Sequence, residues 1–92
     1  MTELFYSGQF IRVMTHKNGV KKLILARPDV RNAFHAEMID EISKALIALA
    51  KIPDESDMRL LIIEGEGKVF SAGADLNYMK EQAKKNRSAK FK

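Results

Sequence analysis

The sequence Phe-Ser-Ala-Gly-Ala-Asp-Leu at residues 70–76 decides how the rest of the chain is interpreted. It leaves a predicted strand, passes through small residues and enters a predicted helix. Small side chains let a ligand approach the main chain closely, and Gly73 can adopt backbone angles that other residues avoid. Free amides at a helix start favour negative charge. The stretch is therefore a candidate site where an amide stabilises an oxyanion formed on a carbonyl.

A simpler interpretation of residues 70–76 is a plain turn from a strand into a helix. In that case Asp75 caps the N-terminus of the helix with its carboxylate, as aspartate commonly does. The stretch by itself does not separate these two interpretations, and the segments that precede it have to decide between them.

Two strands are predicted near the N-terminus, at residues 10–15 and 20–26. Both alternate between apolar and polar residues, although imperfectly, which is typical of half-buried strands. Asn18-Gly19 lies between them and supplies the two positive-φ residues of a type I′ turn. Pro28 then ends the second strand, because proline lacks the amide hydrogen that a sheet requires. The pattern predicts an antiparallel hairpin.

The period changes to that of a helix over residues 36–51, and Pro53 ends this segment. Its apolar residues fall on one stripe: Met38, Ile39, Ile42, Ala45, Leu46 and Leu49. After a polar loop, residues 58–63 form a mostly continuous apolar run, which is typical of a strand covered on both faces. Residues 75–84 are predicted to form a short helix. The order is β-β-α-β-turn-α, which indicates the α/β class with a right-handed crossover.

Composition limits the protein to one small domain without thiol chemistry. The 92 residues bury only about 60% of their unfolded surface. There is no cysteine, which excludes disulfides and thiolate metal sites, and the only histidines are His16 and His35. We therefore expect no metal site. His35 is expected to cap the helix start, and His16 is expected to face solvent.

The net charge of +4 belongs to the C-terminal end of the chain. Residues 1–79 hold 10 Lys/Arg against 11 Asp/Glu, giving −1, whereas residues 80–92 hold 6 Lys/Arg against Glu81, giving +5. Residues 1–84 are therefore the predicted domain body, and residues 85–92 a basic, frayed tail. A nucleic-acid-binding domain would more often be basic across one face, so we expect no nucleic-acid partner.

No membrane segment or secretion signal is visible in the sequence. The longest apolar run, residues 45–50, is far shorter than the ~20 residues that span a bilayer. The N-terminus lacks a basic segment followed by an apolar one. These features predict a cytoplasmic protein that does not interact with membranes.

Two segments together resemble the enoyl-CoA hydratase/isomerase (crotonase) family. Residues 27–38, RPDVRNAFHAEM, are similar to its "RP…NA" segment, and residues 64–76, EGEGKVFSAGADL, to its "G…GK.FSAGADL" segment. They occur in the family's order, and the similarity covers roughly residues 10–80. The resemblance implies the N-terminal part of a crotonase-like ββα superhelix: hairpin, helix, strand, oxyanion turn and short helix. Residues 73–79 look most like 3-methylglutaconyl-CoA hydratase-like members.

The resemblance also implies roles for individual residues. The backbone amide of Ala74 would be one of two oxyanion-hole donors to the thioester oxygen. Ala72 would receive the adenine of CoA, and the guanidinium of Arg31 would lie near its phosphates. Asn77 stands where relatives often have a lysine for those phosphates. The implied CoA-binding residues are Arg31, Ala33, Lys68, Ala72, Gly73, Asp75 and Leu76.

The remaining machinery of the family lies downstream of the matched region. It comprises two catalytic glutamates and the second oxyanion amide. The glutamates of this chain are poor substitutes for the catalytic pair, because Glu64 and Glu66 are expected in a solvated turn and Glu81 in a polar helix. We therefore expect a chain that binds an acyl-CoA thioester as substrate, uses no other cofactor and is inactive without a C-terminal half or subunit. The alternatives are a non-catalytic acyl-CoA-binding or assembly module and a truncated, inactive gene product. The sparsely covered helix stripe also predicts a homo-oligomer.

Overall fold

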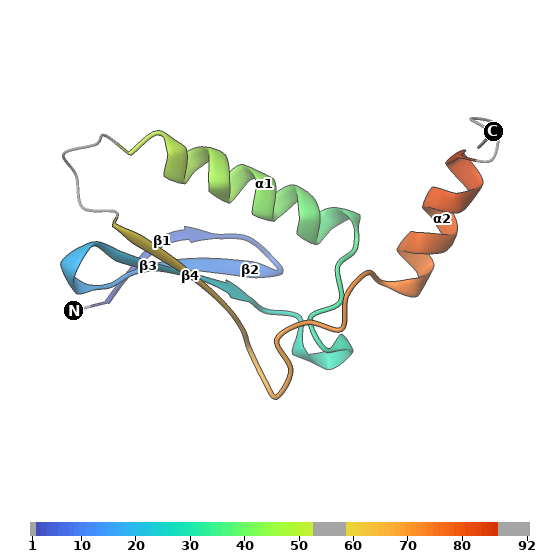
Figure 1. The fold of residues 1–92 in the computed structure, drawn as a ribbon, viewed down its shortest axis with the longest axis horizontal. Helices are drawn as coiled ribbons and strands as arrows, with labels where there is room; N and C mark the ends of the chain where they lie inside the picture. Colours follow the sequence, from blue (N-terminus) through green and yellow to red (C-terminus); the bar gives the residue numbers. More distant parts are fainter. Residues whose placement is uncertain (1, 53–58, 87–92) are drawn as a thin grey trace.

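The computed structural model describes residues 2–52 and 59–86 (Figure 1). Short 3-10 turns lie at Lys17–Gly19 and Pro28–Val30. The strands and helices are, in chain order, β1 (Glu3–Ser7), β2 (Ile11–Thr15), β3 (Val20–Leu25), α1 (Ala36–Ala50), β4 (Leu60–Gly65) and α2 (Leu76–Asn86).

The strands form one sheet in the order β1-β2-β3-β4, and α1 lies across one face of it (Figure 1). The β1/β2 and β2/β3 pairs are antiparallel, whereas β3 and β4 run parallel, with Leu25 opposite Gly65. The α/β class is thus confirmed. Strand β1 was not predicted, because its register shifts between Leu4 and Tyr6 and breaks the alternation on which a sequence-based prediction relies.

The β2–β3 hairpin has the predicted turn. Asn18 and Gly19 have φ angles of 62° and 75°, and the amide of Val20 donates to the carbonyl of Lys17. Positive φ at both central residues is the requirement of a type I′ turn, which asparagine and glycine meet at little steric cost.

The core lies between the sheet and α1. Its fully buried apolar residues are Ile11, Val13, Leu23, Leu25, Met38, Ala45 and Leu49. The carboxylate of Glu41 in α1 also accepts hydrogen bonds from the amides of Gln9 (2.9 Å) and Phe10 (2.7 Å), which ties the helix to the β1–β2 loop. Two residues of the predicted apolar stripe, Ile39 and Leu46, are nevertheless 39% and 43% exposed.

The sequence predicted that residues 58–63 form a strand covered on both faces. For the described residues this expectation is wrong. Strand β4 is bordered by β3 on one side and by no described strand on the other. Leu60 and Ile63 point to opposite faces of the sheet, and they are 52% and 49% exposed. Strand β4 therefore has the composition of an interior strand in an edge position.

Helix α2 extends past its predicted end. It continues through Lys85 to Asn86, so these two residues belong to the helix and not to the tail that was predicted from residue 85. The rest of that tail, residues 87–92, lies outside the described residues, as do Pro53 and the predicted loop before β4.

Candidate functional site

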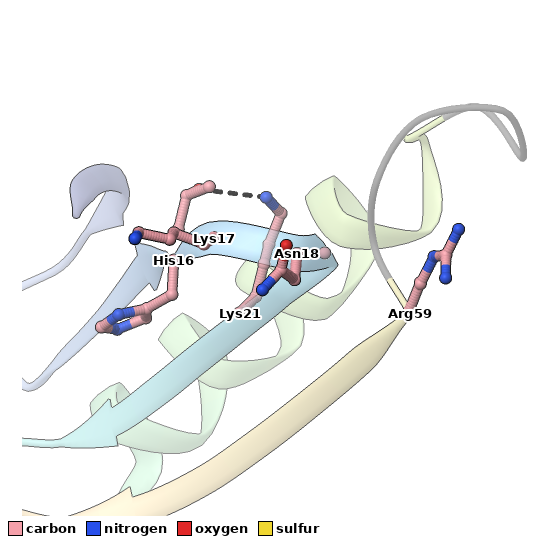
Figure 2. A pocket seen from close by; sticks show the side chains of 7 residues that line it. His16, Lys17, Asn18, Lys21 and Arg59 are labelled. Atoms are coloured by element: carbon pink, nitrogen blue, oxygen red, sulfur yellow. Dashed lines mark hydrogen bonds between the residues drawn. The ribbon is translucent and has the colours of Figure 1, made fainter. Parts of the chain in front are cut away.

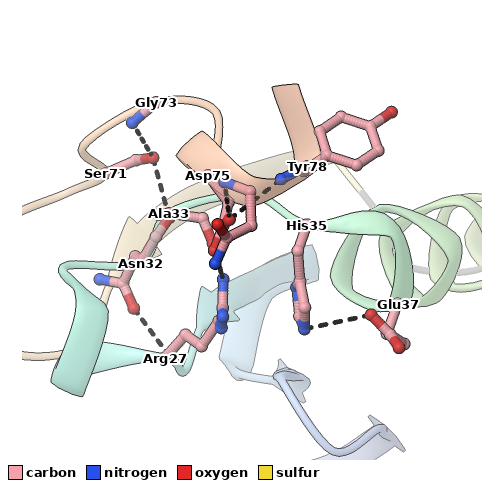
Figure 3. A network of polar contacts seen from close by, with 10 residues as sticks. Arg27, Asn32, Ala33, His35, Glu37, Ser71, Gly73, Asp75 and Tyr78 are labelled. Atoms are coloured by element: carbon pink, nitrogen blue, oxygen red, sulfur yellow. Dashed lines mark hydrogen bonds and ion pairs between the residues drawn. The ribbon is translucent and has the colours of Figure 1, made fainter. Parts of the chain in front are cut away.

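The two motif segments meet at the carboxyl ends of β3 and β4. Because these strands are parallel, the chain segments that leave them start side by side. The amide of Ala72 donates to the carbonyl of Arg31 (2.9 Å), the amide of Phe34 to Gly73 (2.8 Å) and the amide of Asp75 to Phe34 (2.7 Å). A parallel bridge joins Phe34 to Ala74. The small-residue turn is therefore held along its length by the preceding motif (Figure 3).

Asn32 connects the two segments through its buried side chain, which has 0% exposure. Its Oδ1 accepts from the amide of Arg27 (2.8 Å), and its Nδ2 donates to the carbonyls of Glu66 (2.9 Å), Val69 (2.9 Å) and Phe70 (3.1 Å). Its backbone is left-handed, with φ of 56°, a conformation that asparagine tolerates better than most residues. Asn32 thus acts as the structural anchor of the turn.

Sequence reasoning did not assign this role to Asn32, although the residue stands in the "RP…NA" motif. The only local signal was an asparagine shortly after a proline, which is typical of an irregular turn. Its partners at residues 66–70 are more than 30 positions away in the chain. Only the folded structure brings them together.

The close approach of the two segments requires a glycine at position 65. A Cβ atom on Gly65 would lie 2.3 Å from the carbonyl oxygen of Phe70 and 2.8 Å from Nδ2 of Asn32. The first contact is with backbone, which cannot rotate away as a side chain can. Gly73 is also needed, because its φ of 94° disfavours any side chain.

We expect Gly65→Ala to disrupt the turn and to lower the midpoint of urea unfolding. Removing one clash by moving Phe70 would break the Asn32 hydrogen bond to that carbonyl, so the loss should exceed the ~1 kcal/mol typical of a point substitution. Gly67→Ala is a graded control, since its added Cβ would meet only Pro28 at 3.1 Å although its φ is also positive. A larger loss for Gly67→Ala than for Gly65→Ala would contradict this account.

Arg27 and Asp75 form a partly buried ion pair beside the turn. The guanidinium donates to Asp75 Oδ2 (3.3 Å) and to the carbonyl of Ala33 (2.6 Å), and it also lies over the ring of Phe10. The two side chains are 15% and 17% exposed. This pair links the residue before Pro28 to the start of α2 (Figure 3).

Asp75 is the N-terminal cap of α2, as the simpler interpretation predicted. Its Oδ1 accepts from the amides of Asn77 (2.8 Å) and Tyr78 (3.1 Å). The Tyr78 amide above all, helped by that of Asn77 and by Arg27, lowers the pKa of this carboxyl below its usual value of 3.8. The charged form is thus the one that the folded protein favours.

The lowered pKa predicts how the stability contribution of Asp75 depends on pH. A carboxyl whose pKa is depressed by folding stabilises the native state above its unfolded pKa, and this contribution is lost as the pH falls through the folded value. We therefore expect Asp75→Asn to be less stable than the unmodified chain at pH 7, with a gap that narrows below about pH 4. Urea unfolding of both chains at each pH measures the gap. A gap that stays constant or widens on acidification would contradict the assignment.

The amide of Ala74 differs from its neighbours. The amides of Ala72 and Asp75 donate to the preceding motif, and that of Gly73 donates to Ser71 Oγ (3.0 Å). Within residues 2–52 and 59–86, the Ala74 amide donates to no acceptor. Ala74 is exposed and directly precedes the cap of α2. The turn therefore presents an available donor at a helix N-terminus.

The other predicted CoA-binding residues differ in their exposure and contacts. Arg31 and Lys68 line one pocket of about 400 Å³ together with Pro28, Glu66, Gly67 and Val69. Leu76 is 72% exposed at the start of α2. Ala33, in contrast, is buried: its amide donates to Val30 (3.1 Å) and its carbonyl accepts from Arg27. Ala33 therefore holds its segment in place through these main-chain hydrogen bonds.

The remaining titratable candidates make ordinary structural contacts. His35 occupies the N-cap position of α1, but its side chain makes no capping hydrogen bond, so the predicted capping role is wrong. Its ring packs edge-on against Phe10 at 4.5 Å, and Nε2 lies 3.4 Å from Glu37. Glu64 lies in β4, not in the turn, and is 3.8 Å from Lys22, while Glu66 pairs with Arg12 at 3.0 Å.

Among the described residues, no helix has the length and apolarity needed to cross a bilayer. No three His, Asp or Glu side chains in residues 2–52 and 59–86 gather closely enough to hold a metal ion.

Comparison with known proteins agrees with this geometry. The sequence profile of the family described as enoyl-CoA hydratase/isomerase matches residues 15–92. The chain is 34% identical over 64 residues to a probable enoyl-CoA hydratase of Mycobacterium leprae, covering 70% of this chain and 26% of that protein. It is 39% identical over 61 residues to the small ribosomal subunit protein mS47 of Schizosaccharomyces pombe, covering 65% of this chain and 13% of that protein.

A solved structure shares the fold. The enoyl-CoA hydratase of Shewanella pealeana superposes with a TM-score of 0.71 at 34% identity, covering 88% of this chain and 30% of that one. The chain thus spans less than a third of the length of each of these relatives. On the family profile and on this fold, the chain belongs to the enoyl-CoA hydratase/isomerase family, of which it represents an N-terminal portion.

Proposed function

We propose that this chain is the N-terminal part or subunit of an enoyl-CoA hydratase/isomerase that binds an acyl-CoA thioester and supplies one oxyanion-hole amide for hydration of a 2-enoyl-CoA. The observation that carries the proposal is the exposed amide of Ala74, which has no acceptor among the described residues although its neighbours do. An amide held rigidly at a helix N-terminus stabilises negative charge on a carbonyl oxygen without having to reorganise.

The CoA portion of the substrate would extend from Ala74 toward the pocket of Arg31 and Lys68. These two cations line the same cavity, which favours the phosphates of the nucleotide. The main chain around Ala72 would receive the adenine of CoA, and Gly73, Asp75 and Leu76 would shape the pocket. For the acyl group we propose a branched or carboxylated enoyl-CoA such as 3-methylglutaconyl-CoA, from the motif at residues 73–79.

The proton-transfer groups would come from a C-terminal half or subunit. The relatives extend well beyond the length that this chain matches. The family resemblance implies that the two catalytic glutamates lie in that additional part. The half-exposed apolar side chains of β4 and the exposed Leu76 and Met79 of α2 are surfaces that such a partner could cover. We further propose a homo-oligomeric assembly in the cytoplasm.

Reconstitution tests this function. The chain would be mixed with the part of the Shewanella pealeana hydratase that follows the matched region, and hydration of crotonyl-CoA followed by its ultraviolet absorbance. We expect activity from the mixture and none from either part alone. Hydration at ordinary enzyme rates by the purified chain alone would contradict the proposal.

A non-catalytic acyl-CoA-binding or assembly module is the second candidate. One relative of this chain, mS47, is named as a ribosomal protein and not as an enzyme, which supports this candidate. This alternative predicts calorimetric binding of CoA with no hydration, even when a C-terminal half is present. A truncated, inactive product would show neither binding nor hydration.

A further inference from the structure

A basic pocket lies at the opposite end of the sheet from the Ala74 turn. It is formed where β3 and β4 begin, whereas the turn follows their carboxyl ends. The cavity measures about 610 Å³ and is lined by Thr15, His16, Lys17, Asn18, Gly19, Lys21 and Arg59 (Figure 2). As far as residues 2–52 and 59–86 are concerned, the lining includes two lysines and an arginine but no Asp or Glu.

Lys21 is the unusual member of this lining. It is only 8% exposed, and it lies on the same, core-facing side of β3 as the buried Leu23 and Leu25. Its ammonium donates to Thr15 Oγ1 (3.0 Å) and lies 5.0 Å from the centre of the Phe5 ring. Burial of a cation carries a free-energy cost that one hydroxyl and one aromatic face offset only partly.

No acidic side chain in the described part of the chain balances this charge. Within residues 2–52 and 59–86, none of Lys17, Lys21 and Arg59 has a carboxylate oxygen within 4.0 Å. The adjacent Lys22, on the other face of the strand, lies 3.8 Å from Glu64. On β3, therefore, Lys22 on the outer face has a carboxylate partner, whereas Lys21 on the pocket side has none among the described residues.

The backbone holds these groups in place. The amide of Arg59 donates to the carbonyl of Gly19 (2.7 Å), which fixes the start of β4 against the hairpin turn. The type I′ turn at Asn18 and Gly19 sets the positions of Lys17 and Lys21 on either side of it. A rigid frame of this kind lowers the entropic cost of ordering cations around a ligand.

We propose that this pocket binds a phosphate group. Lysine ammoniums bind phosphate as point charges, and an arginine guanidinium can donate two parallel hydrogen bonds to it. A phosphate near neutral pH carries between one and two negative charges, which the three cations would balance. The proposal does not depend on acyl-CoA chemistry at Ala74, since the two places lie at opposite ends of β3 and β4.

The test is a titration of the ¹⁵N-labelled chain with inorganic phosphate at constant ionic strength, followed by two-dimensional NMR. We expect saturable shifts of the amides of residues 17–21 and of Arg59. Lys21→Met, which keeps the apolar stem, should weaken phosphate binding about tenfold or more, because it removes a charge-assisted contact. Lys22→Met is the matched control and should bind phosphate as the unmodified chain does.

A second variant keeps the test independent of the buried position. Lys17→Gln combined with Arg59→Gln changes only exposed side chains, so folding is preserved, and it should also abolish saturation. The proposal is overturned if sodium chloride produces the same shifts as phosphate. It is equally overturned if Lys22→Met weakens binding as much as Lys21→Met does.

Discussion

Replacing Asn32 with alanine is expected to lower the free energy of unfolding of the chain strongly. The side chain accepts one hydrogen bond and donates to three carbonyls in a fully buried position. Each buried polar group left without a partner costs about 1–3 kcal/mol. The loss should therefore exceed about 3 kcal/mol, which is a large share of the stability of a domain of this size. Urea unfolding followed by circular dichroism measures it.

Two variants control for side effects of Asn32→Ala. Asn32→Gly removes the same hydrogen bonds but tolerates the left-handed backbone at φ of 56°, so it isolates the contribution of the side chain. Asn77→Ala removes an exposed asparagine and should change stability by no more than about 0.5 kcal/mol. If Asn32→Gly were as stable as the unmodified chain, the anchor role would be contradicted.

The second large effect concerns Ala74 in the reconstituted enzyme. Ala74→Pro deletes the amide proposed to face the thioester oxygen, and loss of one such donor typically lowers kcat about 100- to 1,000-fold. The expected change is in kcat, with KM for crotonyl-CoA affected far less, because the donor acts mainly on the charge that develops in the transition state. Steady-state kinetics of the mixture separate the two parameters.

Ala74→Gly is the matched variant, since it keeps the amide and removes only a methyl group. It should lose much less activity than Ala74→Pro. The Phe34 and Asp75 amides, which donate on either side of position 74, report by NMR whether the proline variant keeps the turn intact. Equal losses for the two variants, with the turn intact in both, would show that the amide is not the catalytic group.

The parts of the fold that were predictable are those encoded in neighbouring residues. The hairpin follows from Asn18-Gly19. Helix α1 follows from its apolar stripe, of which Met38 and Leu49 are buried in the core. Strand β1 was missed because the shift between Leu4 and Tyr6 removes its periodicity. The coverage of β4 could not be read from its apolar residues, because coverage depends on elements that lie elsewhere in space.

The candidate site shows the same division. The small residues around Gly73 and the cap at Asp75 were visible because each acts within its own turn. The anchor role of Asn32 and the burial of Ala33 were not visible, since both arise from contacts between segments far apart in the chain. Local sequence thus located the turn, while long-range contacts determine how firmly it is held.

The most direct test of the central proposal is the NMR signal of the Ala74 amide in the reconstituted complex. The chain would be labelled with ¹⁵N-alanine, and spectra recorded with a non-reactive acyl-CoA thioester and with free CoA. We predict that the thioester moves the Ala74 signal downfield, as a new hydrogen bond to its oxygen would, whereas free CoA does not. Ala45, buried in the core, is the internal reference. An Ala74 signal that is the same with the thioester and with free CoA would contradict the proposed role of this amide.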